Sequence, residues 1–577
     1  MVKALVFVAS LVFAVTPVAV AQVKNFAPVT EEMLLNPSPD DWLMLSRTYD
    51  QQRFSPLDQI NRRNVAQLRM AWARGMGAGI TESVPTVYQG VMYVVAPGAV
   101  IQALDATNGD LIWEYRRKLP GELFAATART KNLAIYEDLI FYTAPDGYLI
   151  ALDARTGQVR WETMATNPKS GIHTSGPMVV RGKVITGRAC RRVRESCFIA
   201  AHDARTGKEV WKFYVTAAPG EPGGDSWGDM PVEKRTASPW GLPGSYDPVR
   251  KLTYWGIANP TPNTRMERYN GKADTIPQSA PAELYSNSTV ALDPDTGKVV
   301  WYYQELPGDD WDLDHGHEKI LFRTRFNPDP KAVKWINPGI PRGQERDVMV
   351  TVAEAGGIWV LDRATGQFLW ATPFPYDVPE FHISRIDGES GKTYINWDRV
   401  AKKDGDRHVT CFQNTRSYWP LAYHPGKNSL YIPYMDACVD MTVGGDRLTI
   451  ARPSSDPKAL AGIAKVNMAT GQIDWRYTQR APGNGAMLAT AGDLIFWGDL
   501  DRRLRAFDAD TGKVLWETTV GGIISVSTIT YSVKGKQYVA VMTGDGQSGT
   551  AGPLRVATEL KPPRGHNAIY VFALPEQ

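Results

Sequence analysis

The stretch ALDARTGQVRW, residues 151–161, is a well-formed copy of a pattern that recurs along the chain. The pattern begins with a small or apolar residue, any residue and an Asp. Two residues later come Thr-Gly, and three residues after these comes a Trp. Thr-Gly (Asn-Gly in the first copy) supplies the positive-φ position of a tight hairpin between two apolar runs. The Trp would lie on the next strand and pack between neighbouring sheets. Seven copies end at Trp113, Trp161, Trp211, Trp301, Trp370, Trp475 and Trp516.

Further apolar runs with Gly or Asp turns precede several copies, as in residues 90–105, 138–153 and 493–508. Each unit is therefore predicted to be a four-stranded antiparallel meander, and repeated meanders predict an all-β, eight-bladed β-propeller with Trp-docking repeats. Seven blades come from the copies and one is shared between the chain termini. We expect inserts and one degenerate blade in the longer intervals between Asp293 and Asp362 and between Asp362 and Asn467. Segments 216–246 and 372–420, rich in Pro and Gly, are predicted insert loops.

The composition excludes several classes of protein. The chain has 577 residues, of which 43% are hydrophobic and 22% charged, so it is not a disordered chain. Its 64 basic and 61 acidic residues give a net charge of +3. That balance gives no reason to expect a nucleic-acid partner.

The N-terminus is typical of a secretory signal. Lys3 precedes an apolar run from Leu5 to Val15 that is too short to span a bilayer, and Ala19-Val20-Ala21 is a small-x-small cleavage site. No later stretch is apolar enough to form a membrane span. We therefore predict a signal peptide over residues 1–21 and a periplasmic mature protein, residues 22–577, that forms a single propeller domain.

Export permits disulfide bonds. Four cysteines allow three pairings, and the two local ones, Cys190 with Cys197 and Cys411 with Cys438, are favoured. The sequence has no C-x-x-C-H motif, so no c-type haem is expected on this chain.

The repeat, together with RFSPLDQINRRNVAQLRMAW (53–72), WGIANPTPN (255–263) and GDDWDLDHGHEKILF (308–322), resembles the quinoprotein alcohol dehydrogenases. These are eight-bladed propellers that bind pyrroloquinoline quinone (PQQ) on the propeller axis. The resemblance covers essentially the whole mature chain. The cysteine loop and YMDACVDM (434–441) are most similar to the sorbose and deoxynivalenol dehydrogenase branch.

The resemblance assigns site residues. Asp312 matches the catalytic base, and an acidic cluster of Asp309, Asp310, Asp312 and Asp314 suits the neighbourhood of a cation. Asn259 matches a metal-binding Asn, whose amide oxygen suits Ca²⁺. Asp314, on the same face if the segment is a strand, matches an Asp associated with lanthanide use. The cofactor-binding residues implied are Glu82, Lys131, Thr174, Ser175 and Trp240, with Trp240 as the floor under the quinone and Lys131 where an Arg is usual.

The sequence also departs from the family. Ala125 and Ala126 stand where many members have adjacent cysteines, and Arg192 stands where the metal-binding Glu is expected. Glu195 could replace that Glu if the loop shifts. Glu354 occupies the place of a cofactor-contacting Arg or Lys, and Asn484 that of a Trp. The roles of four further residues stay open: His315 and His317 could line the substrate mouth or lie at the surface, and Arg192 and Arg194 could pair with cofactor carboxylates or be solvated.

The resemblance implies a periplasmic PQQ-dependent alcohol dehydrogenase that passes electrons to a separate cytochrome c. With one metal carboxylate missing, Ca²⁺ is the favoured ion and a lanthanide the alternative. The departures suggest a roomier pocket, so we expect a primary or secondary alcohol larger than methanol: a polyol, a ketose or a bulky secondary alcohol. Two alternatives are a non-catalytic propeller scaffold of outer-membrane assembly and a cofactor-binding propeller that has lost metal-dependent activity.

Overall fold

The computed structural model describes residues 22–121, 129–190, 193–412, 415–545 and 548–576. The predicted signal peptide, residues 1–21, lies outside the described residues, as do Ala125, Ala126 and Arg192.

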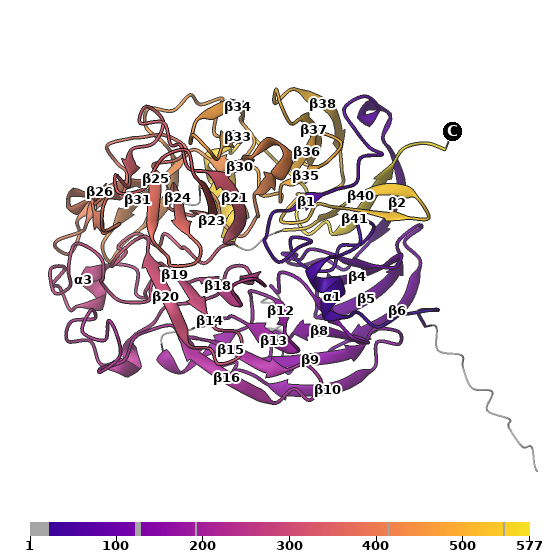
Figure 1. Cartoon of the computed structure of the whole chain (residues 1–577), viewed down its shortest axis with the longest axis horizontal. Helices are drawn as coiled ribbons and strands as arrows, with labels where there is room; N and C mark the ends of the chain where they lie inside the picture. The colour runs from indigo at the N-terminus through magenta and orange to yellow at the C-terminus, as the bar shows by residue number, and fades with distance from the viewer. Residues whose placement is uncertain (1–21, 122–128, 191–192, 413–414, 546–547, 577) are drawn as a thin grey trace, which may run out of the picture.

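Eight antiparallel sheets of four blade strands each form a ring within this part of the chain (Figure 1), which confirms the predicted propeller. The first four blades are β3 (Thr86–Tyr88), β4 (Val91–Ala96), β5 (Val100–Asp105), β6 (Leu111–Arg116); β7 (Ala134–Tyr136), β8 (Leu139–Thr143), β9 (Tyr148–Asp153), β10 (Val159–Met164); β12 (Pro177–Val180), β13 (Lys183–Thr186), β15 (Phe198–Asp203), β16 (Glu209–Tyr214); and β17 (Ser245–Asp247), β18 (Leu252–Gly256), β19 (Ser288–Leu292), β20 (Val299–Gln304).

The other four blades follow the same order. They are β21 (Ile320–Arg325), β23 (Glu345–Ala353), β24 (Gly356–Asp362), β25 (Phe368–Thr372), edged by β22 (Trp335–Ile336); β29 (Ala422–His424), β30 (Ser429–Met435), β33 (Ala461–Asn467), β34 (Ile473–Gln479); β35 (Leu488–Thr490), β36 (Leu494–Gly498), β37 (Arg503–Asp508), β38 (Val514–Thr519), with β1 (Phe54–Ser55) parallel to β35; and β39 (Ile529–Val533), β40 (Lys536–Thr543), β41 (Ala568–Ala573), β2 (Arg69–Gly75).

The eighth blade closes the ring. Its first three strands come from the C-terminal end of the chain, and its outer strand β2 comes from the N-terminal end and pairs with β41, for example Trp72 with Val571. This confirms the prediction of one blade shared between the termini. Pairing the two ends leaves the ring without an open seam.

The repeat works as a docking device between blades. Trp113, on the outer strand of one blade, lies over Gly157 in the turn of the next: a Cβ built on Gly157 would lie 2.4 Å from the indole ring. The Trp113 indole N–H also donates to the Ala154 carbonyl at 3.1 Å. Gly157 has φ +71, so its lack of a side chain serves both the turn and the ring contact. The same contact joins Trp72 to Gly109, Trp161 to Gly207, Trp211 to Gly297, Trp301 to Gly366 and Trp475 to Gly512.

The longer intervals between repeats hold inserts, and the expectation of a degenerate blade there was wrong. The predicted insert loop 372–420 contains the hairpin of β26 (Ile383–Ile386) and β27 (Thr393–Ile395). It also supplies β28 (Arg407–Cys411), which joins β31 (Ala437–Thr442) and β32 (Arg447–Ala451) in a three-stranded sheet, here called the insert sheet. These strands pair with one another and not with a blade.

A few short elements complete the structure. They are the pair β11 (Gly171–Ile172) and β14 (Ala189–Cys190), helices α1 (Glu31–Leu35), α3 (Arg265–Arg268) and α4 (Ser548–Val556), and the 3-10 turns η1 (Val65–Gln67), η2 (Arg194–Ser196), η3 (Val232–Lys234), η4 (Trp397–Arg399) and η5 (Pro425–Lys427). None of the helices in the described residues is long and apolar enough to cross a membrane.

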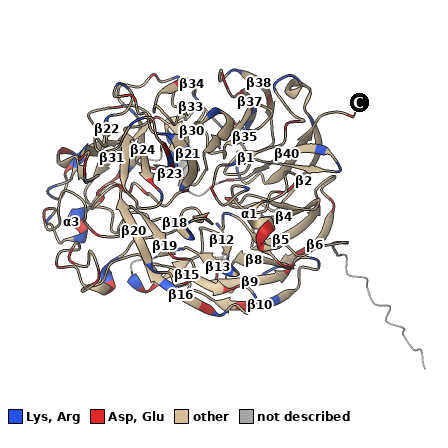
Figure 2. Cartoon of the chain, viewed as in Figure 1, with Lys and Arg blue, Asp and Glu red and all other residues tan. Residues whose placement is uncertain are grey.

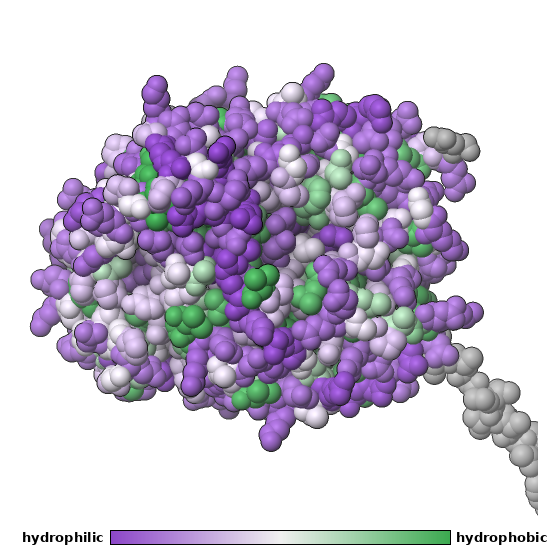
Figure 3. Space-filling view, in the orientation of Figure 1, coloured by the Kyte–Doolittle hydropathy of each residue, from purple (hydrophilic) through white to green (hydrophobic). Residues whose placement is uncertain are grey.

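Both predicted disulfides are present: Cys190–Cys197 closes the loop after β14, and Cys411–Cys438 joins directly opposed residues of β28 and β31. Basic and acidic residues are interspersed around the ring (Figure 2), in keeping with the small net charge. On the face seen in Figure 3 the apolar residues form small separate groups among hydrophilic ones. The surface in this view therefore offers no continuous apolar face.

Candidate functional site

All of the predicted site residues except Asn259, which follows β18, and Glu195, on the turn η2, share one structural position. Glu82, Lys131, Thr174 and Trp240 each lie a few residues before the first strand of a blade, and the loop 309–319 precedes the first strand β21. In Figure 1 first strands such as β12, β21 and β35 lie toward the middle of the ring, and last strands such as β10, β16 and β34 lie at the rim. The segments before the first strands therefore bring residues distant in sequence together near the axis.

The loop that carries Asp312 is buried and held by its own carboxylates. Asp309 accepts the backbone N–H groups of Trp311 and Leu313, both at 2.7 Å. Asp310 accepts those of Arg265 and Ala401. The segment is a loop and not a strand, and Asp309 and Asp310 are fully buried structural acceptors. Their contacts hold Asp312 in the left-handed region, at φ +64.

Asn259 joins the two remaining aspartates. Its side-chain N–H donates to Asp312 Oδ1 at 2.8 Å, and its backbone N–H donates to Asp314 Oδ1 at 3.0 Å. Asp314 is buried, and burial, with the Asp312 charge nearby, raises its pKa to about 7. The Asp312 side chain is 36% exposed, so it is the member of the group that an incoming molecule can reach.

Trp240 is attached to the same group. Its indole N–H donates to Asp314 Oδ2 at 2.7 Å. Its ring meets the rings of His317 and Tyr418 edge-on, with centroids 5.8 and 6.1 Å apart. The ring is only partly buried, although the residues around it are buried.

Lys131 and Glu82 form a fully buried ion pair beside this ring. Lys131 Nζ lies 2.5 Å from Glu82 Oε2, and 5.7 and 4.3 Å from the ring centroids of Trp240 and Tyr418. Burial lowers the pKa of Lys131, and the Glu82 carboxylate opposes that shift. The pair places one cation next to the indole.

Thr174 and Ser175 have different surroundings. The Thr174 hydroxyl donates to the Trp240 carbonyl at 2.8 Å, so it helps to position the indole. The Ser175 hydroxyl is fully buried and exchanges hydrogen bonds with the Gly187 backbone at 3.0 Å. Ser175 therefore has a clear structural role in joining two segments of its blade.

His315 and His317 are fully buried, so the interpretation of either as a surface histidine was wrong. Burial lowers the pKa of both well below the usual range. His317 Nε2 lies 3.8 Å from Glu354 Oε1 and contacts the Trp240 ring. Glu354 is buried too, and burial, with Asp314 nearby, raises its pKa well above the usual range.

Three other predicted residues lie elsewhere or have other partners. Glu195 lies on the exposed turn η2, where Ser170 Oγ is 3.5 Å from its carboxylate, and the structure does not group it with Asn259 and the two aspartates. Arg194 donates to the Thr216 hydroxyl and carbonyl and lies over the Tyr214 ring, so it is neither solvated nor directed to the site. Asn484 is buried before β35, and its carbonyl accepts the Val526 N–H.

Sequence reasoning missed Arg447. This residue, the first of β32 in the insert sheet, places Nη1 2.6 Å from Asp312 Oδ2 and donates from Nη2 to the Trp311 carbonyl at 2.7 Å. No local pattern links residues 447 and 312. Ser417 and Tyr418, which contact Glu354 and Trp240, were also missed; their position before the first strand β29 was the available signal.

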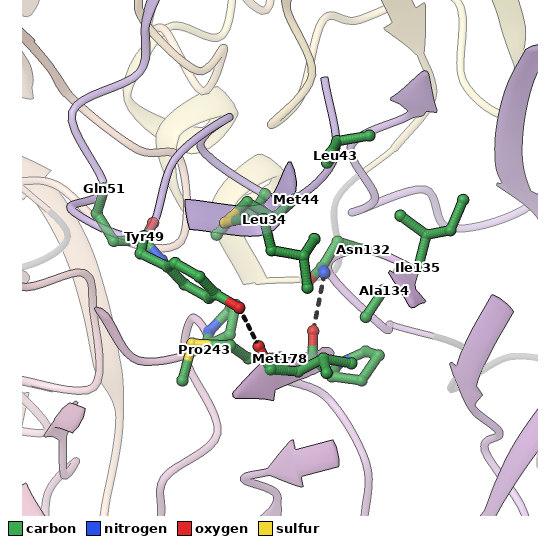
Figure 4. Close-up of a pocket in the computed structure, with 13 residues that line it drawn as sticks. Leu34, Leu43, Met44, Tyr49, Gln51, Asn132, Ala134, Ile135, Met178 and Pro243 are labelled. Carbon is green, nitrogen blue, oxygen red and sulfur yellow. Dashed lines mark hydrogen bonds between the residues drawn. The ribbon is translucent and has the colours of Figure 1, made fainter. Parts of the chain in front are cut away.

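A separate apolar pocket lies under the N-terminal segment (Figure 4). It is lined by residues such as Leu34, Leu43 and Tyr49 from that segment and by Ile135 and Met178 from β7 and β12. No candidate site residue lines it. None of the residues that line it is an acid, a histidine, a cysteine, a lysine or an arginine.

The donor set fits a hard cation. Asn259, Asp312 and Asp314 offer amide and carboxylate oxygens, the ligands that Ca²⁺ prefers. Burial of Asp314 and the neighbouring Asp312 charge raise the pKa of Asp314, and a bound cation would favour its charged form. In the described residues no group of three or more His, Cys, Asp and Glu side chains could hold a metal ion by itself. The partly open indole face, with the Lys131 cation beside it, fits a planar anionic ring.

Comparisons with known proteins agree with this fold. The family model of the glucose/ethanol/alcohol dehydrogenase β-propeller domain that binds PQQ matches residues 42–375 and 459–539. The chain is 31% identical to quinohemoprotein alcohol dehydrogenase ADH-IIG of Pseudomonas putida, over 97% of this chain and 80% of that protein. It is 28% identical to quinoprotein alcohol dehydrogenase PedH of Pseudomonas putida, over 95% and 93% of the two chains. A europium-containing methanol dehydrogenase superposes with a TM-score of 0.83 at 27% identity, covering 94% of this chain and all of that one.

The fold and these matches place the chain in the class of β-propeller dehydrogenases that use PQQ. The chain belongs to the PQQ-dependent alcohol dehydrogenase family.

Proposed function

We propose that this chain is a periplasmic PQQ-dependent dehydrogenase that oxidises a primary or secondary alcohol to the aldehyde or ketone and passes the electrons to a separate cytochrome c. The observation that carries the proposal is the grouping of Asn259, Asp312 and Asp314 beside the Trp240 indole. We propose that residues 1–21 are removed on export and that residues 22–577 act as one domain.

Asp312 is the proposed base. Its carboxylate is the exposed member of the group, so it can accept the proton of the substrate hydroxyl within hydrogen-bond reach. The loop around Asp312 keeps its conformation during this step, because the buried Asp309 and Asp310 carboxylates accept hydrogen bonds from backbone N–H groups. The bound cofactor and metal supply what the side chains lack, a two-electron acceptor and a Lewis acid to polarise it.

Trp240 would support the quinone, Lys131 would pair with its negative charge, and Thr174 would hold the indole in place. Glu82, which pairs with Lys131, and Ser175 complete the proposed cofactor shell. Asn259, Asp312 and Asp314 would hold the metal, for which Ca²⁺ is proposed and a lanthanide is the alternative. Glu195 was the predicted fourth ligand; its exposed position gives that assignment no support.

The substrate is proposed to be larger than methanol: a polyol, a ketose or a bulky secondary alcohol. Reconstitution of the purified protein with PQQ and either Ca²⁺ or a lanthanide, with a dye as acceptor, tests the proposal. We expect dye reduction with such alcohols, lost on removal of the metal with a chelator. Turnover with methanol far above every bulkier alcohol would contradict the substrate class. PQQ binding without turnover on any metal would favour a propeller that has lost its metal-dependent activity.

A further inference from the structure

The insert sheet reaches the candidate base through one side chain. Arg447 Nη1 lies 2.6 Å from Asp312 Oδ2, and Arg447 Nη2 donates to the backbone carbonyls of Trp311 and Asp312 at 2.7 and 3.3 Å. One guanidinium therefore holds both the carboxylate and the backbone of the same residue. The Arg447 side chain is 23% exposed, although Nη1, the atom nearest the Asp312 carboxylate, is buried.

The carboxylate of Asp312 is fixed from two directions. Asn259 binds Oδ1 and Arg447 contacts Oδ2, so rotation of the carboxylate about its axis is opposed at both oxygens. The residue also has a positive φ, a backbone conformation that costs a non-glycine residue about 1–2 kcal/mol and persists only when neighbouring contacts hold it. The hydrogen bonds from Arg447 to the Trp311 and Asp312 carbonyls help to hold the backbone in this conformation.

Arg447 itself is held by elements outside the blades. It begins β32 and is paired with Met441 of β31; β31 pairs with β28, and the Cys411–Cys438 disulfide joins those two strands. On its other side β32 packs against α4, where a Cβ on Gly552 would lie 2.9 Å from the Thr449 hydroxyl. The strand pairing, the disulfide and the contact with α4 therefore hold Arg447 in place.

We propose that Arg447 is a positioning residue for the reaction: the disulfide-braced insert sheet exists to hold the Asp312 carboxylate in its reactive place. This rests on the proposed function, in which Asp312 is the base. A base must lie within hydrogen-bond reach of the proton it takes, and a displacement of about 1 Å can lower the rate about 100-fold. A guanidinium can contact the carboxylate and the carbonyls together, whereas an ammonium is a single point charge.

The test compares Arg447→Ala and Arg447→Lys with a matched control, Arg407→Ala. Arg407 lies on β28 of the same sheet and pairs with Asp440 at the exposed surface, with its side chain 70% exposed. In protein loaded with PQQ and metal we expect Arg447→Ala to lower kcat by about 100-fold, with PQQ affinity, followed by quenching of tryptophan fluorescence, within about two-fold of wild type. Arg447→Lys should be intermediate and Arg407→Ala unchanged. Added guanidinium ion at millimolar concentration should restore part of the activity of Arg447→Ala only.

A second readout does not need turnover. Hydrogen exchange of the backbone amides of residues 309–314 should be faster in Arg447→Ala than in wild type and unchanged in Arg407→Ala. The inference is overturned if Arg447→Ala keeps kcat and exchange rates like those of Arg407→Ala. It is also overturned if lost activity comes with lost PQQ binding and no guanidinium rescue, which would mark a merely structural residue. An inactive wild type with the expected exchange pattern would instead count against the proposed function alone.

Discussion

The blades and the insert sheet acquire their positions in different ways. Each blade is placed by a contact that its own sequence repeats, a Trp of one unit on a Gly of the next. The insert sheet has no such repeat; a disulfide, a packed helix and the Arg447–Asp312 contact place it. The family match stops at residue 375 and resumes at 459, so it omits the whole insert sheet together with β29 and β30. The family model thus covers most of the ring, while the insert sheet that contacts the candidate base lies in the interval between the two matched ranges.

The largest loss of activity should follow from a change at Asp312, where the insert sheet contacts the loop before the blade strand β21. Asp312→Asn should lower turnover by about 10²–10⁴-fold, because the amide cannot take a proton. Steady-state kinetics with a dye acceptor measure this, and Asp295→Asn, an exposed surface carboxylate, is the matched control. Activity retained in Asp312→Asn would show that the base is elsewhere.

Within the ring, Lys131→Met should lower the free energy of unfolding by about 3–5 kcal/mol, because it removes one member of the fully buried Lys131–Glu82 ion pair. The urea midpoint measures the loss. Lys131→Met with Glu82→Gln should recover much of it, and Lys183→Met, whose partner Asp295 is exposed, should be mild. Equal midpoints for the two lysine variants would contradict the importance of burial.

The disulfide tests the insert sheet alone. Replacing Cys411 and Cys438 by Ser removes a cross-link between residues 27 apart, worth about 3.5 kcal/mol by loop-closure entropy. We expect this loss to appear as faster hydrogen exchange in residues 407–451 and lower turnover, with little change in the exchange of the blades. A uniform loss of protection around the ring would mean that the two regions are not separable.

The glycines that contact a Trp of the preceding blade test how much each such contact contributes to the stability of the ring. Gly207→Ala should cost about 2–4 kcal/mol, from the positive φ of +71 and a Cβ 2.5 Å from the Trp161 ring. Gly182→Ala has a similar φ, +69, but no neighbouring atom within 4 Å, so it should cost only the backbone part, about 1–2 kcal/mol. Thermal or urea midpoints of the two variants separate the docking contact from the strain, and identical midpoints would remove the role given to Trp161.

The accuracy of the sequence predictions follows the same division. The blades, their closure and both disulfides could be predicted, because each depends on residues that recur or lie close in the chain. The grouping of Asn259, Asp312, Asp314 and Trp240 was available only through resemblance. Arg447 was not available at all, since its contact depends on the path of an insert that folds apart from the repeat. The burial of His315 and His317 was missed because nothing in DHGHEK distinguishes a loop that turns inward from one that turns outward.

The shared eighth blade has a consequence for the order of assembly. Strand β2, near the beginning of the chain, cannot find its partner until β41, residues 568–573, has left the ribosome. A ligand on the axis thus has no finished binding place until synthesis is complete. A chain that lacked its last ten residues would lack β41, the strand that pairs with β2. The ring would then stay open, and the edge of its first blade would be exposed to proteases.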